Sequence, residues 1–367
     1  MRPLLVFLIL FFAVTLKAET PAKKYYDAKV GLWYTVWWDS HERDPHFFEH
    51  HWLKETRVKP IKHGYYASDD PKKLKDDFRY FRRIGIDYLI LDDTNAHGND
   101  AGNIAAHIEA CFTVAAELGD DAPKLCFAGG RPLIGGDVAG MQVELDIFAD
   151  YAKRFPKNTF YWREKPLFVN FNIPENYGYQ DQQERFTMRP AAGHISEGIP
   201  HREKYELDKI GMYGWVFNVQ YDGSEVYGIT PGFSRSHNNL GTSVPPISRK
   251  NGKRYQQQWL AAVKRNPEMI VISSWNDHAE ETGIEAVELL ENIPGRGEEN
   301  PFFYEKTTQG YLALKTGLLE DWCYRKENDS IVYRFRNNKL EPVAQLDAKE
   351  VVIVVPDDYF AWINLDP

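Results

Sequence analysis

Two carboxylates near residue 280 have the types and spacing that acid–base chemistry requires. Asp277 and Glu280 lie three apart in a stretch crowded with polar, acidic and aromatic residues, 273–285. The apolar run Met269–Ile272 before it is typical of a buried strand, and residues three apart project to one side if the segment turns helically. Glycoside hydrolysis uses such a pair, one carboxyl to donate a proton and another to act on the sugar or a water. We therefore predict Glu280 and Asp277 as catalytic residues; surface charges or a helix cap are the alternative.

Other polar and aromatic residues also follow predicted strands. In a β/α barrel the loops that leave the carboxyl ends of the strands converge on one open mouth. Aromatic faces there can stack on sugar rings, and carboxylates or amides can bind hydroxyls, whereas core packing and helix capping are the alternative roles. The predicted substrate-binding residues are Trp33, Tyr34, Trp37, Tyr65, Tyr66, Asp92, Asp93, Asn170, Asn172, Trp275, Asn276, His278 and Glu285.

The elements that must position these residues alternate along the chain. Helices are predicted near 71–84, 104–118, 141–155 and 254–265, and strands at 29–38, 86–91, 125–128, 166–171, 214–219, 228–233 and 269–272. An eighth strand is expected within 172–205. This alternation predicts an α/β fold, a (β/α)8 TIM barrel over residues 25–320. The rival, an open doubly wound sheet, lacks the Gly-x-Gly-x-x-Gly turn after an early strand.

The two ends of the chain differ in character from the barrel. Residues 1–18 combine Arg2 with an apolar run and a small residue, Ala18, which is typical of a cleaved signal peptide. We expect a secreted or periplasmic protein with no membrane span in the mature chain, because no later segment has the roughly 18 apolar residues required. Short strands without helices predict a small β-rich appendage at 321–367.

Composition excludes several classes of function. The 53 acidic and 44 basic residues give a net charge of −9, which opposes the basic footprint of a nucleic-acid-binding protein. The 3 cysteines form neither a disulfide framework nor a zinc cluster. We expect an oligosaccharide or polysaccharide as the substrate and no cofactor or metal; the sequence does not predict an oligomeric state.

One motif favours a different enzyme. His46, Glu49 and His50 match the His-x-x-Glu-His arrangement of some zinc peptidases, in which two histidines bind the metal and the glutamate is the base. Pro45 permits only a short helix start here, and no third ligand is identifiable. A zinc peptidase is therefore the less favoured enzymatic alternative.

The stretch that holds the carboxylate pair resembles a known motif. Residues 275–285, WNDHAEETGIE, resemble the Trp-Asn-Glu-x-x-Glu-Gly-Thr-x-Ile-Glu motif of glycoside hydrolase family 99, the endo-α-mannosidases. They also resemble the Trp-Asn-Asp-x-x-Glu motif of family 71, the α-1,3-glucanases. Segments 64–71, 165–168, 229–233 and 249–259 follow the order of family 99 as well, so the resemblance covers about residues 30 to 290.

The resemblance implies roles for the pair. Glu280 would be the general acid/base with a raised pKa, and Asp277 would stay ionised where family 99 has a glutamate that deprotonates the sugar 2-hydroxyl. Three departures separate the chain from the family: Asp277 is one methylene shorter, His278-Ala279 replace Trp-His, and Ala286 replaces a proline. The expected function is hydrolysis of an α-linked mannan or glucan. A catalytically silent glycan-binding barrel is the alternative.

Overall fold

The computed structural model describes most of the predicted barrel and the strands of the C-terminal region. The predicted signal peptide, residues 1–18, and Asn172 lie outside the described residues. These are 26–94, 103–130, 138–170, 181–191, 206–215, 223–235, 245–293, 296, 301–316, 323–325, 331–336, 339–345, 350–355 and 359–364.

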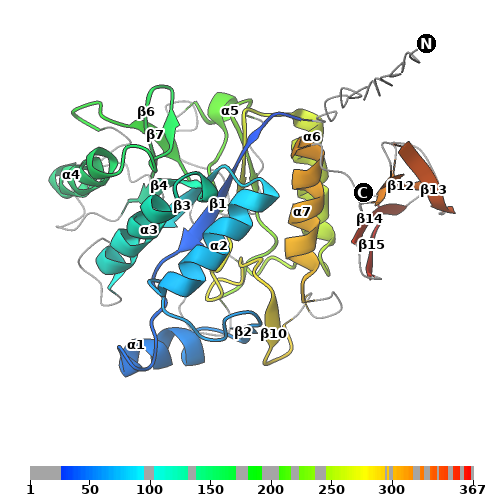
Figure 1. The fold of residues 1–367 in the computed structure, drawn as a ribbon, viewed down its shortest axis with the longest axis horizontal. Coiled ribbons are helices and arrows are strands. Elements are labelled where there is room, and N and C mark those ends of the chain that lie inside the picture. The colour runs from blue at the N-terminus through cyan, green and yellow to red at the C-terminus, as the bar shows by residue number, and fades with distance from the viewer. Residues whose placement is uncertain are drawn as a thin grey trace, which may run out of the picture.

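A largely parallel sheet forms the centre of the molecule (Figure 1). Within the described residues it has eight strands, and all except the short β5 (Tyr161–Trp162) run parallel. Their order across the sheet is β8 (Val226–Ile229), β9 (Met269–Ile272), β1 (Lys29–Thr35), β3 (Tyr88–Asp92), β4 (Lys124–Gly129), β6 (Lys165–Asn170) and β7 (Thr187–Pro190). The strand predicted within 172–205 is therefore present as β7.

The sheet does not close into an eight-stranded barrel, because β7 and β8 are not paired with each other. Described residues of the connecting segment approach both strands instead. The Tyr213 amide donates to the Pro190 carbonyl at the end of β7 (2.9 Å), and the Ser224 amide before β8 donates to the Lys209 carbonyl (2.9 Å). The prediction of a TIM-barrel-like α/β fold is thus confirmed, but the described strands do not form a closed (β/α)8 barrel.

The predicted strand 214–219 is not found in its described part, 214–215. Gly211, Gly214 and Trp215 all have positive φ, which a β-strand does not allow. At Gly211 a Cβ would lie 2.3 Å from the Val226 carbonyl oxygen, so the close approach to β8 requires glycine.

Strand alternation separates an inner from an outer core. The inner cluster contains Trp33, Tyr88, Cys126 and Met269 from four strands and no residue of the long helices. Gly31 makes room for the Tyr88 ring, which a Cβ would approach at 2.4 Å. Side chains at these alternate positions therefore fill the concave side of the sheet.

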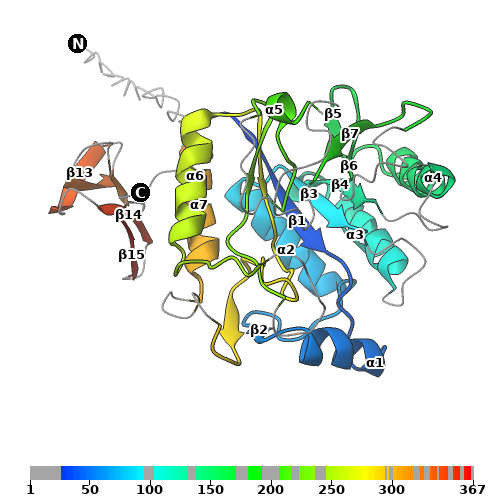
Figure 2. The same cartoon turned by 180° about the vertical axis from the view of Figure 1, so that it is seen from behind.

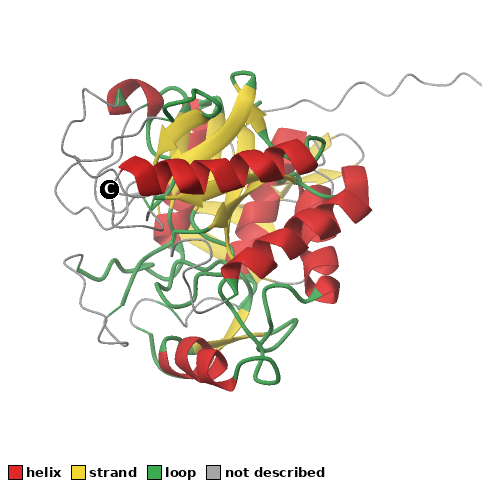
Figure 3. Ribbon diagram, turned by 90° about the vertical axis from the view of Figure 1, so that its left-hand side faces the viewer, coloured by secondary structure: helices red, strands yellow, loops and turns green. Residues whose placement is uncertain are grey.

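The outer core packs the sheet against long helices: α2 (Pro71–Ile84), α3 (Ile104–Leu118), α4 (Val138–Arg154), α6 (Lys253–Arg265) and α7 (Phe303–Thr316). Figure 3 shows helices lying against the strands. The ends of α2 follow the sequence prediction. Asp70 caps it by accepting from the amides of Lys72 (2.8 Å) and Lys73 (3.2 Å), and Gly85 ends it in the left-handed conformation.

The remaining elements of the barrel region are short. They are α1 (Pro45–Phe48), the π-helical turn η1 (Glu49–Lys54), β2 (Val58–Pro60), the 3-10 turn η2 (Gly119–Asp121), α5 (Leu207–Ile210) and β10 (Val287–Leu289). Cys111 and Cys126 are buried free thiols. No helix within the described part of the chain is long and apolar enough to cross a membrane.

The C-terminal region is a separate antiparallel sheet. Its strands are β11 (Cys323–Arg325), β12 (Ile331–Arg336), β13 (Lys339–Gln345), β14 (Glu350–Val355) and β15 (Tyr359–Asn364), in the order β13-β12-β11-β14-β15. It lies beside α6 and α7, through β15 and β14 (Figures 1 and 2). Within the described residues after Thr316 the structure has strands and no helix.

Candidate active site

The loop after β9, residues 273–286, folds back on itself at the carboxyl end of the sheet. The amides of Thr282 and Gly283 donate to the Asp277 carbonyl at 3.1 and 2.9 Å, and the Ser274 amide donates to the Thr282 carbonyl at 3.1 Å. Buried Arg249 supports the loop by donating to the carbonyls of Glu281 (2.6 Å) and Gly283 (2.7 Å). We call this segment the β9 loop.

The β9 loop brings Asp277 and Glu280 together. The Glu280 amide donates to Asp277 Oδ1 at 2.8 Å, so Asp277 caps its own turn. Asp277 is 0% exposed, and its Oδ2 has no hydrogen-bond partner among the described residues. Burial, and next the charge of Glu280, raises the pKa of Asp277 well above its usual range. The prediction that Asp277 stays ionised is therefore wrong. Its buried site favours the neutral acid.

Glu280 is the more exposed member of the pair and has two donors on other segments. Trp215 Nε1 donates to its Oε2 at 2.6 Å, and Arg235 Nη1 lies 3.3 Å from its Oε1. The Trp215 ring in turn packs edge-on against Trp33, with centroids 4.3 Å apart. The carboxylate is thereby held from the β7–β8 connection and from the segment after β8.

Sequence reasoning missed both Trp215 and Arg235. A signal was present for each, since Trp215 lies within the predicted strand 214–219 and Arg235 follows the motif segment 229–233. Each lies within or just after a strand-like run, where the other candidates were chosen.

Asn276 ties the β9 loop to the end of β1. Its Oδ1 accepts from the Thr35 amide and hydroxyl, both at 2.8 Å, and its Nδ2 donates to the Thr35 carbonyl at 3.0 Å. Nδ2 also donates to the Tyr66 hydroxyl at 3.2 Å. Asn276 is fully buried, so it is part of the framework and does not fit the predicted sugar-binding role.

Tyr66, Glu285 and His278 form a buried network behind the loop. Glu285 Oε2 accepts from the Tyr66 hydroxyl at 2.9 Å and lies 3.1 Å from His278 Nε2. Burial lowers the pKa of His278, against the opposing effect of Glu285, so its ring is neutral near pH 7. These three residues orient the loop. The prediction that they contact the substrate is therefore wrong, because they are buried and contact one another.

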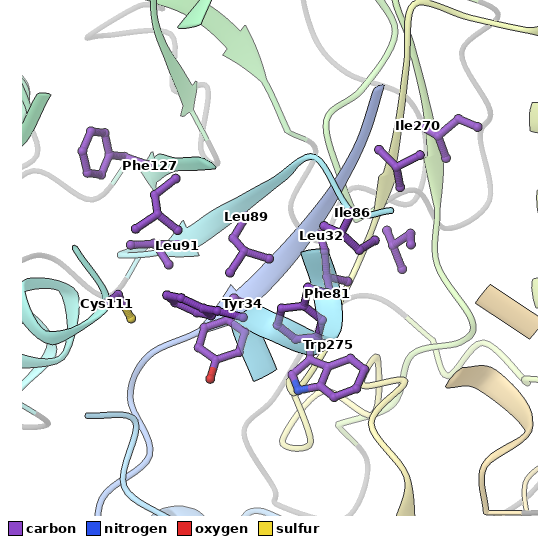
Figure 4. Close-up of a cluster of buried hydrophobic side chains, with 14 of the residues drawn as sticks. Leu32, Tyr34, Phe81, Ile86, Leu89, Leu91, Cys111, Phe127, Ile270 and Trp275 are labelled. Carbon is purple, nitrogen blue, oxygen red and sulfur yellow. The ribbon is translucent and has the colours of Figure 1, made fainter. Parts of the chain in front are cut away.

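Most of the predicted aromatic platforms are core residues. Trp275 packs on Phe81 with ring centroids 4.7 Å apart, and Tyr34 accepts from Lys73 Nζ at 2.7 Å; both lie in the outer core (Figure 4). Trp33 points inward and donates to the Tyr213 carbonyl at 2.6 Å. The prediction that these three rings bind sugar is therefore corrected.

Trp37 and Tyr65 are the partly exposed members of the predicted aromatic set. Tyr65 contacts the Trp52 ring at 5.2 Å, and Trp37 lies beside Trp38 at 6.3 Å. Both remain candidates for contact with a sugar ring.

The predicted polar residues at the ends of β3 and β6 are buried. Asp92 accepts from the Thr94 amide at 3.1 Å, and its charge contributes to the raised pKa of Asp277. Asp93 lies close to Glu144, where burial and then the charge of Asp93 raise the pKa of the Glu144 carboxyl well above its usual range. Asn170 is buried at the end of β6. Asn172 lies outside the described residues.

The predicted peptidase motif is not assembled. Within the part of the chain that the structure describes, His46 and Glu49 belong to no group of three potential ligands. His50 is grouped with His51 and Glu55 instead, with one ligand atom of each residue within 4.8 Å of the others. The His46–Glu49–His50 reading is therefore wrong as a metal set.

The sheet, its covering helices and the strand-end site define a TIM-barrel-like α/β protein. Similar solved structures include the GH99 endo-α-mannosidase from Bacteroides thetaiotaomicron, with a TM-score of 0.59, 16% identity, and coverage of 80% of this chain and 99% of that chain. The same enzyme in complex with bis-tris propane gives a TM-score of 0.59 and 16% identity over 78% and 97% of the two chains. A glycoside hydrolase-like protein has a TM-score of 0.49 and 14% identity over 80% and 97%.

No family model and no curated protein matches the sequence. At 16% identity the structural similarity shows the fold. The family 71 resemblance stays a prediction.

Proposed function

We propose that this chain is a glycoside hydrolase that cleaves an α-linked glycan, with Glu280 as the general acid/base. The observation that carries the proposal is the carboxyl pair itself. Glu280, 8% exposed, is held by Trp215 and Arg235 beside Asp277, which is 0% exposed and favours its neutral form. Asp277, the neutral member, keeps a proton within the pair, which suits a site that must first donate and then accept one.

The roles follow from exposure. Glu280 donates its proton to the leaving glycosidic oxygen as the bond from that oxygen to the anomeric carbon breaks, and then takes a proton from the water whose oxygen forms the new bond to that carbon. Asp277 acts through Glu280 as a positioning residue. Its Oδ1 accepts the Glu280 amide and so fixes the backbone there, and its neutral carboxyl keeps a proton beside Glu280. This reassigns Asp277 from the direct role that the family 99 resemblance implies.

Two further observations support the proposal. The fold is similar to that of a GH99 endo-α-mannosidase, and the motif resemblance falls on the β9 loop that holds the pair. We propose an α-mannan or α-glucan substrate on this basis. We further propose that the protein is exported, because residues 1–18 have the pattern of a signal peptide.

A screen of α-mannan, α-glucan and sulfated glycans tests the function. The wild type is expected to release sugars from one of them, and Glu280→Gln to lose about 10²–10⁴-fold in rate, since a general acid contributes that much. The matched control is Glu288→Gln, the same change at an exposed residue of β10, which should keep wild-type activity. Full activity of Glu280→Gln would remove Glu280 from the mechanism. Glycan binding without cleavage by the wild type would favour the silent barrel.

A further inference from the structure

The turn η1 brings together potential metal ligands that the proposed hydrolase does not use. In η1 the Glu55 amide donates to the His50 carbonyl at 3.1 Å, the five-residue step of a π-helix. This wider turn aligns Glu55 with His50, and Glu55 Oε1 lies 3.6 Å from His50 Nδ1. An ordinary α-helical turn would align His50 with residue 54 instead.

His51 is oriented as a metal ligand usually is. Its Nδ1 lies 3.1 Å from the Trp37 carbonyl oxygen, which can only accept, so Nδ1 carries the proton. In the neutral ring the lone pair is then on Nε2. A backbone carbonyl that fixes the second ring nitrogen in this way is the outer-shell contact that accompanies most metal-bound histidines.

We propose that His50, His51 and Glu55 bind a zinc ion. One ligand atom from each residue lies within 4.8 Å of the other two, so modest side-chain rotations bring all three to an ion at about 2.0–2.2 Å. Two imidazoles and one carboxylate are a donor set that zinc accepts, with the remaining position open to water. The His50 side chain is 48% exposed, which gives an ion access from solvent.

The contacts of η1 indicate what the ion does. His51 touches the Trp38 ring edge-on, with centroids 6.2 Å apart, and Trp38 stacks on Trp52 at 4.0 Å. Trp38 Nε1 donates to the Asn276 carbonyl at 3.1 Å, which connects this cluster to the β9 loop. All three ligands belong to η1 and the residue that follows it, so the ion closes this turn on itself, and the ring contact of His51 with Trp38 connects the turn to the segment after β1.

Zinc titration of the chelator-treated protein by calorimetry tests the site. The wild type is expected to bind one equivalent of Zn²⁺. His50→Ala and Glu55→Gln should each weaken binding at least about tenfold, since even loss of an outer-shell contact costs 10–100-fold. His46→Ala is the matched control, an exposed histidine of the neighbouring turn outside the proposed set, and should bind as the wild type does.

Two further readouts keep the result unambiguous. Zn²⁺ should raise the Tm of the wild type and of His46→Ala but not that of His50→Ala, and Co²⁺ should give a visible absorption band that His50→Ala loses. Near-UV circular dichroism shows that each variant is folded. Absence of a stoichiometric site, or equal weakening by His46→Ala and His50→Ala, would overturn the proposal. Glu280→Gln should bind zinc normally, which separates this test from that of the hydrolase.

Discussion

A single methylene at residue 277 changes what its carboxylate can do. Asp277 is short enough for its Oδ1 to accept the amide of Glu280, three residues on, as aspartates in tight turns do. The longer glutamate that the family 99 resemblance places here has more reach toward a substrate. In this chain the same carboxyl both shapes the turn and, through its burial, keeps a proton beside Glu280.

Asp277→Asn tests this double role. Asparagine still accepts the Glu280 amide, so the variant should fold with an unchanged Tm. It removes the titratable carboxyl that keeps a proton beside Glu280, so kcat should be reduced with KM unchanged, and the pH–rate profile should change shape because only one carboxyl of the pair still titrates. The profile is measured on the glycan that the wild type cleaves. An unchanged profile with a lowered Tm would mean that Asp277 is only structural.

Glu305, on α7, should make stability depend on pH. Burial raises its pKa from 4.5 to about 7; the charges of Glu285 and Asp77 act in the same direction, whereas the Ala286 amide and Lys62 oppose it. The folded state therefore binds more protons than the unfolded state between about pH 4.5 and 7, and stability falls as pH rises through this window.

Removing that titration should stabilise the protein above pH 7. Glu305→Gln keeps an acceptor for the Ala286 amide and is expected to raise the free energy of unfolding by up to about 3 kcal/mol at pH 8, with little change at pH 4. Urea unfolding at both pH values measures it, with Glu288→Gln as the exposed control. A gain of equal size at pH 4 and pH 8 would contradict the titration argument.

At the scale of elements, the sequence predicts what local patterns determine. Apolar runs locate β1, β3, β4, β6, β8 and β9, and Asp70-Pro71 and Gly85 locate the ends of α2. The rule that residues following the carboxyl ends of parallel strands gather at one end of the sheet places Asp277, Glu280 and Asp92 together. The rule cannot show which side chains face inward, so Trp33 and Tyr34, adjacent on β1, were both predicted to bind sugar although they enter opposite cores.

Irregular segments were the least predictable part of the site. Trp215 and Arg235 reach Glu280 from positions that no periodic pattern marks. The positive φ of Trp215 breaks the strand that its neighbours predict, and it persists because the surrounding contacts fix it. Such contacts depend on tertiary structure, which propensity does not encode.

The connection between β1 and the β9 loop should be a main support of the site. Asn276→Ala leaves the Thr35 amide, hydroxyl and carbonyl without their buried partner, so it is expected to lower the free energy of unfolding by about 2–3 kcal/mol. Glycan cleavage should fall as well, because the loop carries the pair. Gln257→Ala, an exposed position on α6, is the control for urea unfolding. Equal urea midpoints for the two variants would show that the connection is dispensable.

At the scale of the whole molecule, the barrel-like body and the C-terminal sheet differ in how far the shared fold requires them. The structure of the GH99 endo-α-mannosidase is matched over 99% of its length by only 80% of this chain. The shared fold is therefore complete without about a fifth of the sequence. Among the described residues, the strands β11–β15 pair with one another and with no other strand, and the sheet lies beside α6 and α7.

A chain that ends at Thr316, the last residue of α7, should consequently fold and remain active. All residues of the two cores whose side chains the structure describes lie before this point, so the truncated protein is expected to unfold cooperatively and to keep its near-UV circular dichroism. Its Tm should be lower than that of the full chain, because α6 and α7 lose the cover of β15 and β14. Glycan cleavage should be retained and should still be abolished by Glu280→Gln. A truncated chain without near-UV signal would show that the C-terminal sheet is an integral part of the body, with its contacts to α6 and α7 required for folding.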